Sequence, residues 1–250
     1  MGNIRKELVE EMDESKRVLI IIPAYNEAEN LEKVIDNLLR NYSQYDYVII
    51  NDGSTDQTKQ VCIKNHYHVL NLPINMGIGG AVQTGYRYAE ENGYDMAVQI
   101  DGDGQHDVAF LEGMIHRMEE EQADCVIGSR FVEKEGFQSS GLRRMGIKFL
   151  SSLGWILTGV RVKDITSGYR LFNRSFISIF ADDYPADYPE PEAMVIAAVH
   201  EGKIREYPVV MRERENGTSS ITFKKAVYYM FKVTLAMLIR RLSFGVRRRK

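Results

Sequence analysis

Short apolar runs alternate with amphipathic segments along the first half of the chain. The runs are rich in β-branched residues and lie at Val18–Ile22, Tyr47–Ile50, His68–Leu72, Met96–Ile100 and Cys125–Gly128. Such runs predict strands that are covered on both faces of a sheet. Helical segments separate them, and this alternation predicts a mostly parallel sheet flanked by helices in an α/β fold.

The segments between the runs carry apolar residues at helical spacing. In Glu29–Arg40 the apolar positions fall three and four residues apart, which is the pattern of a helix with one buried face. Ser54 and Thr55 are favoured caps for a second helix that reaches about Asn65. Two further helices are predicted over Ile78–Asn92 and Val108–Glu121.

Composition narrows the class of protein. The chain has 250 residues, of which 44% are hydrophobic and 27% are charged, and its net charge is −3. These values fit a globular protein and argue against a nucleic-acid partner. Cys62 and Cys125 are expected to be buried thiols in a reducing cytosol. The charged N-terminus is unlike a signal peptide, and no run reaches the roughly 20 apolar residues that span a bilayer.

Two segments of the second half, Leu142–Val160 and Lys224–Leu242, combine basic and bulky apolar residues and predict C-terminal amphipathic helices. Basic amphipathic helices bind anionic membranes, whereas apolar helix faces more commonly pack on a core or on a second subunit. The basic cluster from Arg240 to Lys250 favours membrane contact for the second segment, and a homo-oligomer stays open. The apolar residues expected largely on one face of that segment are Val227, Met230, Phe231, Leu235, Leu238 and Leu242.

Every predicted strand is followed by a polar or glycine-rich stretch. These stretches are Pro23–Glu27, Asn51–Asp56, Asn71–Ala81, Asp101–His106 and Gly128–Phe131. In open α/β sheets, ligands bind beyond the carboxyl ends of the strands. One polar stretch is a turn, but five at one edge predict a binding site.

The stretch after the fourth run contains Asp101, Asp103 and Gln105 around two glycines. Gly102 lets the chain curl, so that both carboxylates approach one cation, and oxygen ligands suit Mg²⁺ or Mn²⁺. An Asp-Gly hairpin turn is the alternative, but a predicted helix follows instead of a strand. For His106 we favour a polar position at the helix start over a partner of the metal ligands.

The glycines Gly77, Gly79 and Gly80 precede or open a predicted helix. They allow either a simple turn or a close approach of the backbone to a phosphate at the helix N-terminus. The sequence contains neither a G-x-G-x-x-G dinucleotide motif at its first strand nor a Walker motif. Asp52 and Asp56 are either turn and capping residues or part of the binding site, and their local pattern favours neither interpretation.

Five motifs in order resemble those of family 2 glycosyltransferases with the Rossmann-like GT-A fold, in particular the dolichol-phosphate-mannose-synthase-like and polyprenyl-phosphate subgroup. They are IIPAYNEAENL, VIINDGSTDQT, NMGIGGAVQTGY, VQIDGDGQHD and VIGSRF. The resemblance implies a catalytic domain over residues 1–220, with a nucleotide-sugar half at about 17–131 and an acceptor half at about 132–220. A basic amphipathic helix and tail follow at 221–250.

The resemblance also implies site residues. Those expected to line the nucleotide sugar are Pro23, Ala24, Tyr25, Glu27, Asp52, Gly77, Gly79, Gly80, Asp101, Gly102 and Arg130. The divalent metal on the diphosphate would be bound by Asp103 and Gln105, and by Asp101 through ribose or a metal-bound water. The family often has Asp-Ala-Asp where this chain has Asp-Gly-Asp, which removes only a methyl group.

The segment Asp164–Ser175 resembles the part of the family that lies near the acceptor phosphate. Arg170 is predicted to bind this phosphate, because a guanidinium matches phosphate oxygens in bidentate fashion, and Arg130 is a second candidate. Asp164 and Glu192 are candidate bases, although Glu192 equally suits the N-terminal dipole of a helix. The loop at 212–221 resembles one that folds over the diphosphate.

The resemblance implies metal-dependent, inverting transfer of a sugar from a nucleoside-diphosphate sugar to a polyprenyl phosphate or a lipid-linked glycan. The expected setting is cell-envelope polysaccharide synthesis, in the cytoplasm at the inner face of the membrane. A non-catalytic, regulatory subunit is one alternative. A sugar-phosphate nucleotidyltransferase is another, but it would carry a glycine-rich basic loop where this chain has Pro23–Glu27.

Overall fold

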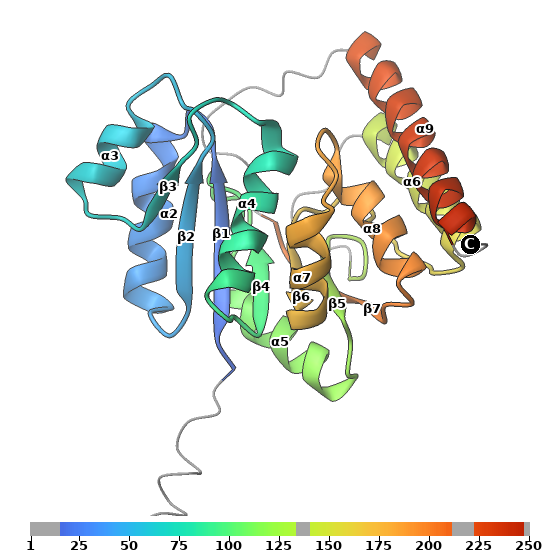
Figure 1. Ribbon diagram of the computed structural model, residues 1–250, viewed down its shortest axis with the longest axis horizontal. Helices are drawn as coiled ribbons and strands as arrows, with labels where there is room; N and C mark the ends of the chain where they lie inside the picture. The colour runs from blue at the N-terminus through green and yellow to red at the C-terminus, as the bar shows by residue number, and fades with distance from the viewer. Residues whose placement is uncertain (1–15, 134–140, 212–222, 248–250) are drawn as a thin grey trace, which may run out of the picture.

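The computed structural model of the protein describes residues 16–133, 141–211 and 223–247. Within them, seven strands form one sheet in the order β3-β2-β1-β4-β6-β5-β7, with helices on both faces (Figure 1). The strands are β1 (Val18–Ala24), β2 (Asp46–Asn51), β3 (Val69–Asn71), β4 (Met96–Gln99), β5 (Cys125–Ser129), β6 (Arg170–Asn173) and β7 (Ile204–Pro208).

Eight α-helices and one 3₁₀ helix connect or follow the strands in the described residues. They are α2 (Ala28–Asn41), α3 (Thr58–Lys64), α4 (Gly77–Glu91), η1 (Val108–Phe110), α5 (Leu111–Glu120), α6 (Gly141–Thr158), α7 (Arg174–Asp182), α8 (Pro189–Val199) and α9 (Phe223–Arg247). The four helices predicted in the first half are confirmed as α2, α3, α4 and α5, the last with η1 as its first turn.

The five predicted strands are confirmed as β1 to β5, and they all run in the same direction. β1 pairs in parallel with β2 and β4, and β2 pairs in parallel with β3. Two strands were not predicted. β6 lies antiparallel between β4 and β5, and β7 pairs in parallel with β5. The two predicted halves of the catalytic domain therefore share one sheet.

The reversed direction of β6 determines what lies at the functional edge of the sheet. The carboxyl ends of β1 to β5 meet at one edge because these strands are parallel. β6 starts at this edge, since Arg170 is in register with Ile127 near the end of β5. The loop at 164–169, which precedes β6, therefore joins the loops that follow the other strands.

Alternate residues of the strands feed two apolar layers, as strand geometry requires. On one face, Ile20, Ile22 and Val98 pack with α2 and α5. On the other face, Ile21 and Phe172 pack among α4, α7 and α8. Both cysteines are buried, as predicted. Burial raises the pKa of Cys62 to about 11 and that of Cys125 to about 12, so both thiols are inert at neutral pH.

The two predicted amphipathic helices are α6 and α9, which lie side by side next to α8 (Figure 1). Val233 and Met237 form the buried face of α9. A second apolar face is exposed and consists of Phe231, Leu235, Leu238, Ile239 and Leu242. Met230 was expected with this stripe but turns toward Gly146 of α6 instead, and the side chain of Val227 lies outside the described residues. In the described part of the chain, no helix is long and apolar enough to cross a bilayer.

Asp56 joins the starts of two helices on the first face of the sheet. Its carboxylate accepts hydrogen bonds from the N–H of Thr58 at 2.9 Å and from the N–H of Ala28 at 3.3 Å, the first residues of α3 and α2. The prediction that Ser54 and Thr55 cap α3 was wrong. The residue at the cap position is Gln57, without a side-chain cap hydrogen bond, and the hydroxyls of Ser54 and Thr55 bond to Asn26 of the neighbouring loop.

We expect Asp56→Ala to lower the free energy of unfolding by about 1 kcal/mol at pH 7. Burial raises the pKa of Asp56, but hydrogen bonds from Thr58 and Ala28 outweigh this effect and hold the pKa below its ordinary value. Asp56 therefore stabilises the fold above its unfolded pKa of about 3.9, and this stabilisation is lost as the pH falls through the lower folded pKa. Urea denaturation from pH 7 to pH 2 should show the gap between variant and wild type closing below about pH 4. A gap that stays constant would contradict the assignment.

Candidate active site

We call the edge of the sheet at which β1 to β5 end the rim of the site. Its first side is formed by the loops after β1 and β2. Pro23 and Ala24 are the buried last residues of β1, whereas Tyr25 is 47% exposed. Asn26 adopts a left-handed backbone with φ of 58°, which asparagine tolerates better than most residues. Its Oδ1 accepts the N–H of Thr55 at 2.9 Å. Asn26 thus locks the two loops together, a role that was not predicted.

Asp52 and the glycines lie on the same side of the rim. Asp52 is buried, and its Oδ1 accepts the N–H of Met76 at 2.7 Å, just before α4 begins at Gly77. A Cβ at Gly79 would lie 2.0 Å from the carbonyl oxygen of Pro185, and one at Gly80 would lie 2.6 Å from Met76 Cβ. Close packing alone therefore requires glycine at 79 and 80, and their contact with a nucleotide stays a prediction.

The acidic motif after β4, which consists of Asp101, Asp103 and Gln105, is held in place by hydrogen bonds from neighbouring residues. Asp101 Oδ1 accepts a hydrogen bond from Gln99 Nε2 at 3.0 Å, and Asp103 Oδ1 accepts the N–H of Gln105 at 3.0 Å. A Cβ at Gly102 would approach the carbonyl oxygen of Pro23 to 3.4 Å, so the motif lies against the end of β1. One third of the Asp101 side chain is exposed.

The donor set fits a hard divalent cation. Within the residues that the structure describes, no cluster of three or more His, Cys, Asp or Glu side chains is placed to bind a metal. Two carboxylates and an amide oxygen nevertheless match Mg²⁺, which typically takes one or two carboxylates and completes its coordination with substrate phosphates and water. Asp101, Asp103 and Gln105 are therefore suited to a metal that arrives with a diphosphate.

His106 supports Asp101 and is not a helix-start residue, which corrects our interpretation of the sequence. Its ring is buried and stacks on Tyr169 with the ring centroids 5.1 Å apart. Nδ1 accepts the N–H of Asp101 at 3.1 Å, while Nε2 lies 3.8 Å from Asp101 Oδ2. Asp107, the next residue, caps the following helix instead. The stacking partner of His106 is Tyr169, which lies just before β6 and far away in the sequence, so the local pattern could not indicate this position.

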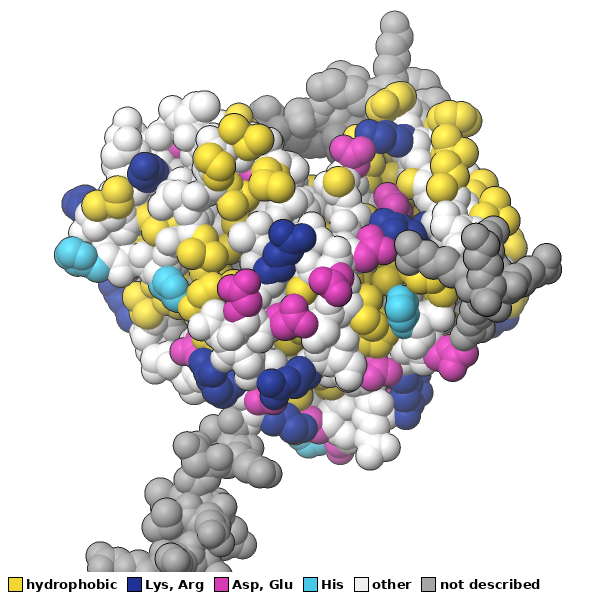
Figure 2. Space-filling view, viewed as in Figure 1, with side chains coloured by type: hydrophobic (Ala, Val, Ile, Leu, Met, Phe, Trp, Pro, Cys, Tyr) yellow, Lys and Arg dark blue, Asp and Glu magenta, His cyan; other side chains and the backbone are white. Residues whose placement is uncertain are grey.

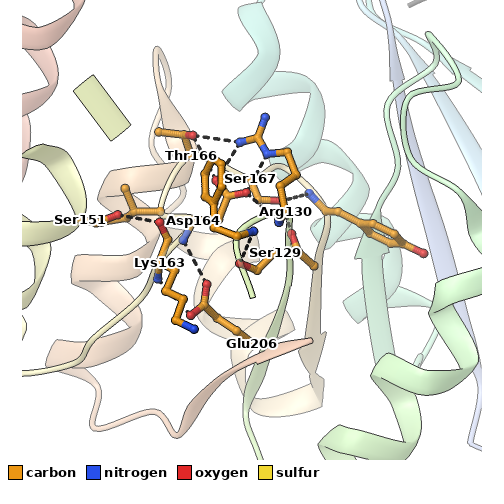
Figure 3. Close-up of polar contacts among 12 residues, drawn as sticks. Ser129, Arg130, Ser151, Lys163, Asp164, Thr166, Ser167 and Glu206 are labelled. Carbon is orange, nitrogen blue, oxygen red and sulfur yellow. Dashed lines mark hydrogen bonds and ion pairs between the residues drawn. The ribbon is translucent and has the colours of Figure 1, made fainter. Parts of the chain in front are cut away.

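A buried ion pair joins the loops after β5 and before β6 (Figure 3). Arg130 Nε and Nη2 each donate to the Asp164 carboxylate at 2.7 Å, and the backbone N–H of Arg130 donates at 3.2 Å. Thr166 contributes a further hydroxyl donor at 3.3 Å. Asp164 is fully buried. Its carboxylate thus neutralises the Arg130 guanidinium and accepts four hydrogen bonds, and its role as a base stays a prediction.

Glu206 holds this pair from below, and sequence reasoning missed it. Its two carboxylate oxygens accept the backbone N–H groups of Lys163 and Asp164, each at 3.0 Å (Figure 3). Glu206 lies on β7 in register with Ile127 of β5. No local pattern could have indicated this role, since 42 residues separate Glu206 from Asp164.

Arg170 has a structural position that speaks against phosphate binding. Its side chain is 1% exposed. Its guanidinium donates to three backbone carbonyls, those of Ser167 at 2.7 Å, Ile165 at 2.7 Å and Glu190 at 2.5 Å. The guanidinium nitrogens that were predicted to bind a phosphate are therefore bonded to backbone carbonyl oxygens. Through these bonds, Arg170 connects the loop before β6 to the start of α8.

The two acids at the start of α8 have different surroundings. Glu192 contacts α9, with its Oε2 3.8 Å from Arg240 Nε. Burial raises the pKa of Glu190, and the Asp101 carboxylate raises it further. Glu190, which was not among the predicted site residues, therefore interacts electrostatically with Asp101 of the acidic motif, while the role of Glu192 as a base stays a prediction.

In open α/β sheets of this kind, ligands bind beyond the carboxyl ends of the strands, and the polar loops of this protein lie at that edge. The family described as Glycosyl transferase family 2 matches residues 19–180, and the chain belongs to it. The protein is therefore a glycosyltransferase. The match covers β1 to β6 and includes the acidic motif, Arg130 and Asp164.

Relatives from several organisms align with most of the chain. An N-acetylglucosaminyltransferase of Methanococcus voltae, which uses UDP-N-acetylglucosamine and dolichyl phosphate, is 32% identical over 78% of this chain and 85% of its own. Polyprenol monophosphomannose synthase of Mycolicibacterium smegmatis is 30% identical over 88% and 86%, respectively. Undecaprenyl-phosphate mannosyltransferase of Micrococcus luteus is 33% identical over 82% and 88%.

A solved structure confirms the GT-A fold. Glucosyl-3-phosphoglycerate synthase from Mycobacterium tuberculosis, in complex with Mn²⁺ and UDP-glucose, superposes with a TM-score of 0.67 at 20% identity. The superposition covers 94% of this chain and 82% of that one. At this identity the likeness shows the shared fold and no more.

We expect Arg170→Lys to destabilise the protein by about 3 kcal/mol or more, because lysine cannot reach three diverging carbonyls and leaves buried acceptors unpaired. Arg174→Lys is the matched control. Arg174 is 67% exposed and lies 3.5 Å from Asp95, so its replacement should change stability by less than about 0.5 kcal/mol. Urea denaturation measures both. Normal stability in Arg170→Lys, combined with lost acceptor binding, would restore the phosphate-binding prediction.

Proposed function

We propose that the protein transfers a sugar from a nucleoside-diphosphate sugar to a polyprenyl phosphate, with inversion at the anomeric carbon and with Mg²⁺ or Mn²⁺. The main support for this proposal is that the Arg130–Asp164 ion pair and the acidic motif lie at the same rim. A side chain at Gly168, in the loop of Asp164, would approach Asp101 Oδ1 to 3.7 Å. The Arg130–Asp164 pair and the acidic motif therefore belong to neighbouring loops of one site.

Asp101, Asp103 and Gln105 would hold the metal ion. When bound, the ion neutralises negative charge on the diphosphate leaving group. The protein itself contributes the placement of these oxygens. Gln99 and His106 hold Asp101, and the N–H of Gln105 holds Asp103, so little reorganisation is needed when the substrate binds.

The acceptor is best assigned as a phosphate. In the reaction, an acceptor oxygen bonds to the anomeric carbon while the bond from that carbon to the diphosphate oxygen breaks, and its electron pair leaves with the nucleoside diphosphate. A hydroxyl acceptor needs a general base, whereas a phosphate is already anionic. Asp164 is buried in an ion pair with Arg130, a position that supports an acceptor needing no base, and the names of the relatives agree.

Arg130, the second candidate from the sequence, is assigned to the acceptor phosphate, because its guanidinium faces a carboxylate whereas that of Arg170 faces three backbone carbonyls. A guanidinium fixed by a carboxylate at two of its nitrogens has a defined direction, which suits recognition of an anion. The Arg130–Asp164 geometry supplies this fixation. The nucleotidyltransferase alternative is not supported, because the loop after β1 is not glycine-rich and is tied to the next loop by Asn26.

The exposed apolar face of α6 and α9 is assigned to a membrane. On α6, Met145, Phe149 and Ile156 are at least half exposed, and the basic residues Arg144 and Lys148 lie beside them. Figure 2 shows hydrophobic side chains along the edge of the molecule over α9. An anionic membrane surface matches apolar and basic groups side by side, and it is where a polyprenyl phosphate resides. The protein would therefore act in the cytoplasm at the inner face of the membrane.

We expect one sugar nucleotide among radiolabelled UDP-, GDP- and dTDP-sugars to label undecaprenyl phosphate in detergent with Mg²⁺ or Mn²⁺. Asp103→Asn should lower this turnover at least about 100-fold by weakening the metal site, while Glu112→Gln, an exposed acid on α5, should not change it. Nucleotide release without lipid labelling would move the acceptor to a lipid-linked glycan. The absence of turnover with every donor would refute the proposed reaction.

The double variant Phe231→Asp/Leu242→Asp should bind anionic vesicles at least about tenfold more weakly. Each buried side chain of this kind is worth about 1.5 kcal/mol or more, and about 1.4 kcal/mol is tenfold in affinity. Ile63→Asp is the control, because Ile63 is 60% exposed on α3, far from α9 (Figure 1). Vesicle co-sedimentation measures the effect. Equal binding by all three proteins would exclude the α9 face as the contact.

A further inference from the structure

The segment at 183–188, which joins α7 to α8, lies against the first turn of α4. It contains no helix or strand of its own. The N–H of Gly79 donates to the carbonyl oxygen of Ala186 at 3.1 Å, and a Cβ at Gly79 would be only 2.3 Å from that oxygen. The segment therefore forms a wall beside the helix start that carries the predicted nucleotide-contacting glycines.

The other side of this segment is attached to α9 at both of its ends. Arg240 Nη1 lies 2.9 Å from both carboxylate oxygens of Asp183. Lys232 Nζ lies 2.6 Å from Asp187 Oδ2. Since eight residues of an α-helix span about 12 Å, Lys232 and Arg240 hold the segment at two well-separated points.

An edge-on aromatic contact strengthens the attachment near the end of the segment. The rings of Tyr188 and Tyr229 lie 4.6 Å apart at 88°, and Lys232 Nζ lies 5.5 Å from the centroid of the Tyr188 ring. Arg240 also lies 3.8 Å from Glu192 at the start of α8. α9 thus contacts both the segment and the helix that follows it.

These ion pairs suit positioning better than overall stability. The side chains of Asp183 and Asp187 are 43% and 62% exposed, and exposed pairs stabilise a fold only weakly. The residue after Asp183 is anchored independently, because Tyr184 is buried in an aromatic cluster with Tyr86 and Phe180. The chain just before the segment is also tied to α4, because Gln83 Nε2 donates to the carbonyl oxygens of Ala181 and Asp182. The pairs with α9 add a constraint on the exposed side chains of Asp183 and Asp187.

We propose that Arg240 and Lys232 are positioning residues for the donor site. They hold the 183–188 segment against Gly79, and so they couple nucleotide-sugar binding to α9, the helix that exposes an apolar face on its other side. The proposal rests on the proposed function in one respect, namely that the start of α4 borders the nucleotide sugar. It assigns Arg240 and Lys232 no contact with the reacting atoms.

A charge exchange between Asp183 and Arg240 tests this coupling. Arg240→Asp should raise the KM for the sugar nucleotide about tenfold while kcat changes less than about twofold. The same variant should speed hydrogen exchange at the Gly79 amide about tenfold, since its acceptor Ala186 is released. The double variant Asp183→Arg/Arg240→Asp restores the pair with opposite polarity and should recover most of both effects.

Arg241→Asp is the matched control, because Arg241 is the next residue of α9 but donates to the carbonyl of Leu157 on α6. It should leave both the donor KM and Gly79 exchange unchanged. Equal effects of Arg240→Asp and Arg241→Asp, or no recovery in the exchanged pair, would overturn the proposal. Hydrogen exchange needs no turnover, so an inactive wild type with intact coupling would refute the proposed function alone. Unchanged exchange in an active Arg240→Asp variant would refute the coupling alone.

Discussion

The buried ion pair between Arg130 and Asp164 is the interaction on which the rim depends. Removing two charges from water is costly, and the cost is offset only when the geometry is good and the remaining donors and acceptors are satisfied. Asp164 meets this condition with four hydrogen bonds, and Glu206 holds the backbone beneath it. This pair fastens the loop before β6 to the end of β5.

The same loop brings the two halves of the site together. Because β6 runs against its neighbours, the loop reaches the edge where β4 ends, and Tyr169 provides the surface on which His106 stacks. His106 in turn holds the backbone of Asp101. The direction of β6 thus affects the acidic motif through the stacked rings of Tyr169 and His106. These two rings help to preorganise the charged groups of the rim.

The helices at the end of the chain extend this organisation away from the sheet. α9 uses Val233 and Met237 to pack on the core, and it leaves Phe231 and Leu242 exposed. Its basic residues divide between two tasks, since Arg240 pairs with Asp183 whereas Arg241 binds a carbonyl of α6. One helix therefore contacts the 183–188 segment and presents the exposed apolar face that we propose binds a membrane.

The sequence by itself determined the five parallel strands, their helices, the glycosyltransferase family and the acidic motif, because these depend on local periodicity and on residues close together in the chain. Only the tertiary structure decided the roles of Asp164, Arg170 and Glu206. An arginine that binds phosphate and one that binds backbone carbonyls look alike in a sequence, since the difference lies in which distant groups surround the guanidinium. β6 was missed for the same reason. Its four residues carry too little pattern, and its place between β4 and β5 is determined by pairing partners that lie far away in the chain.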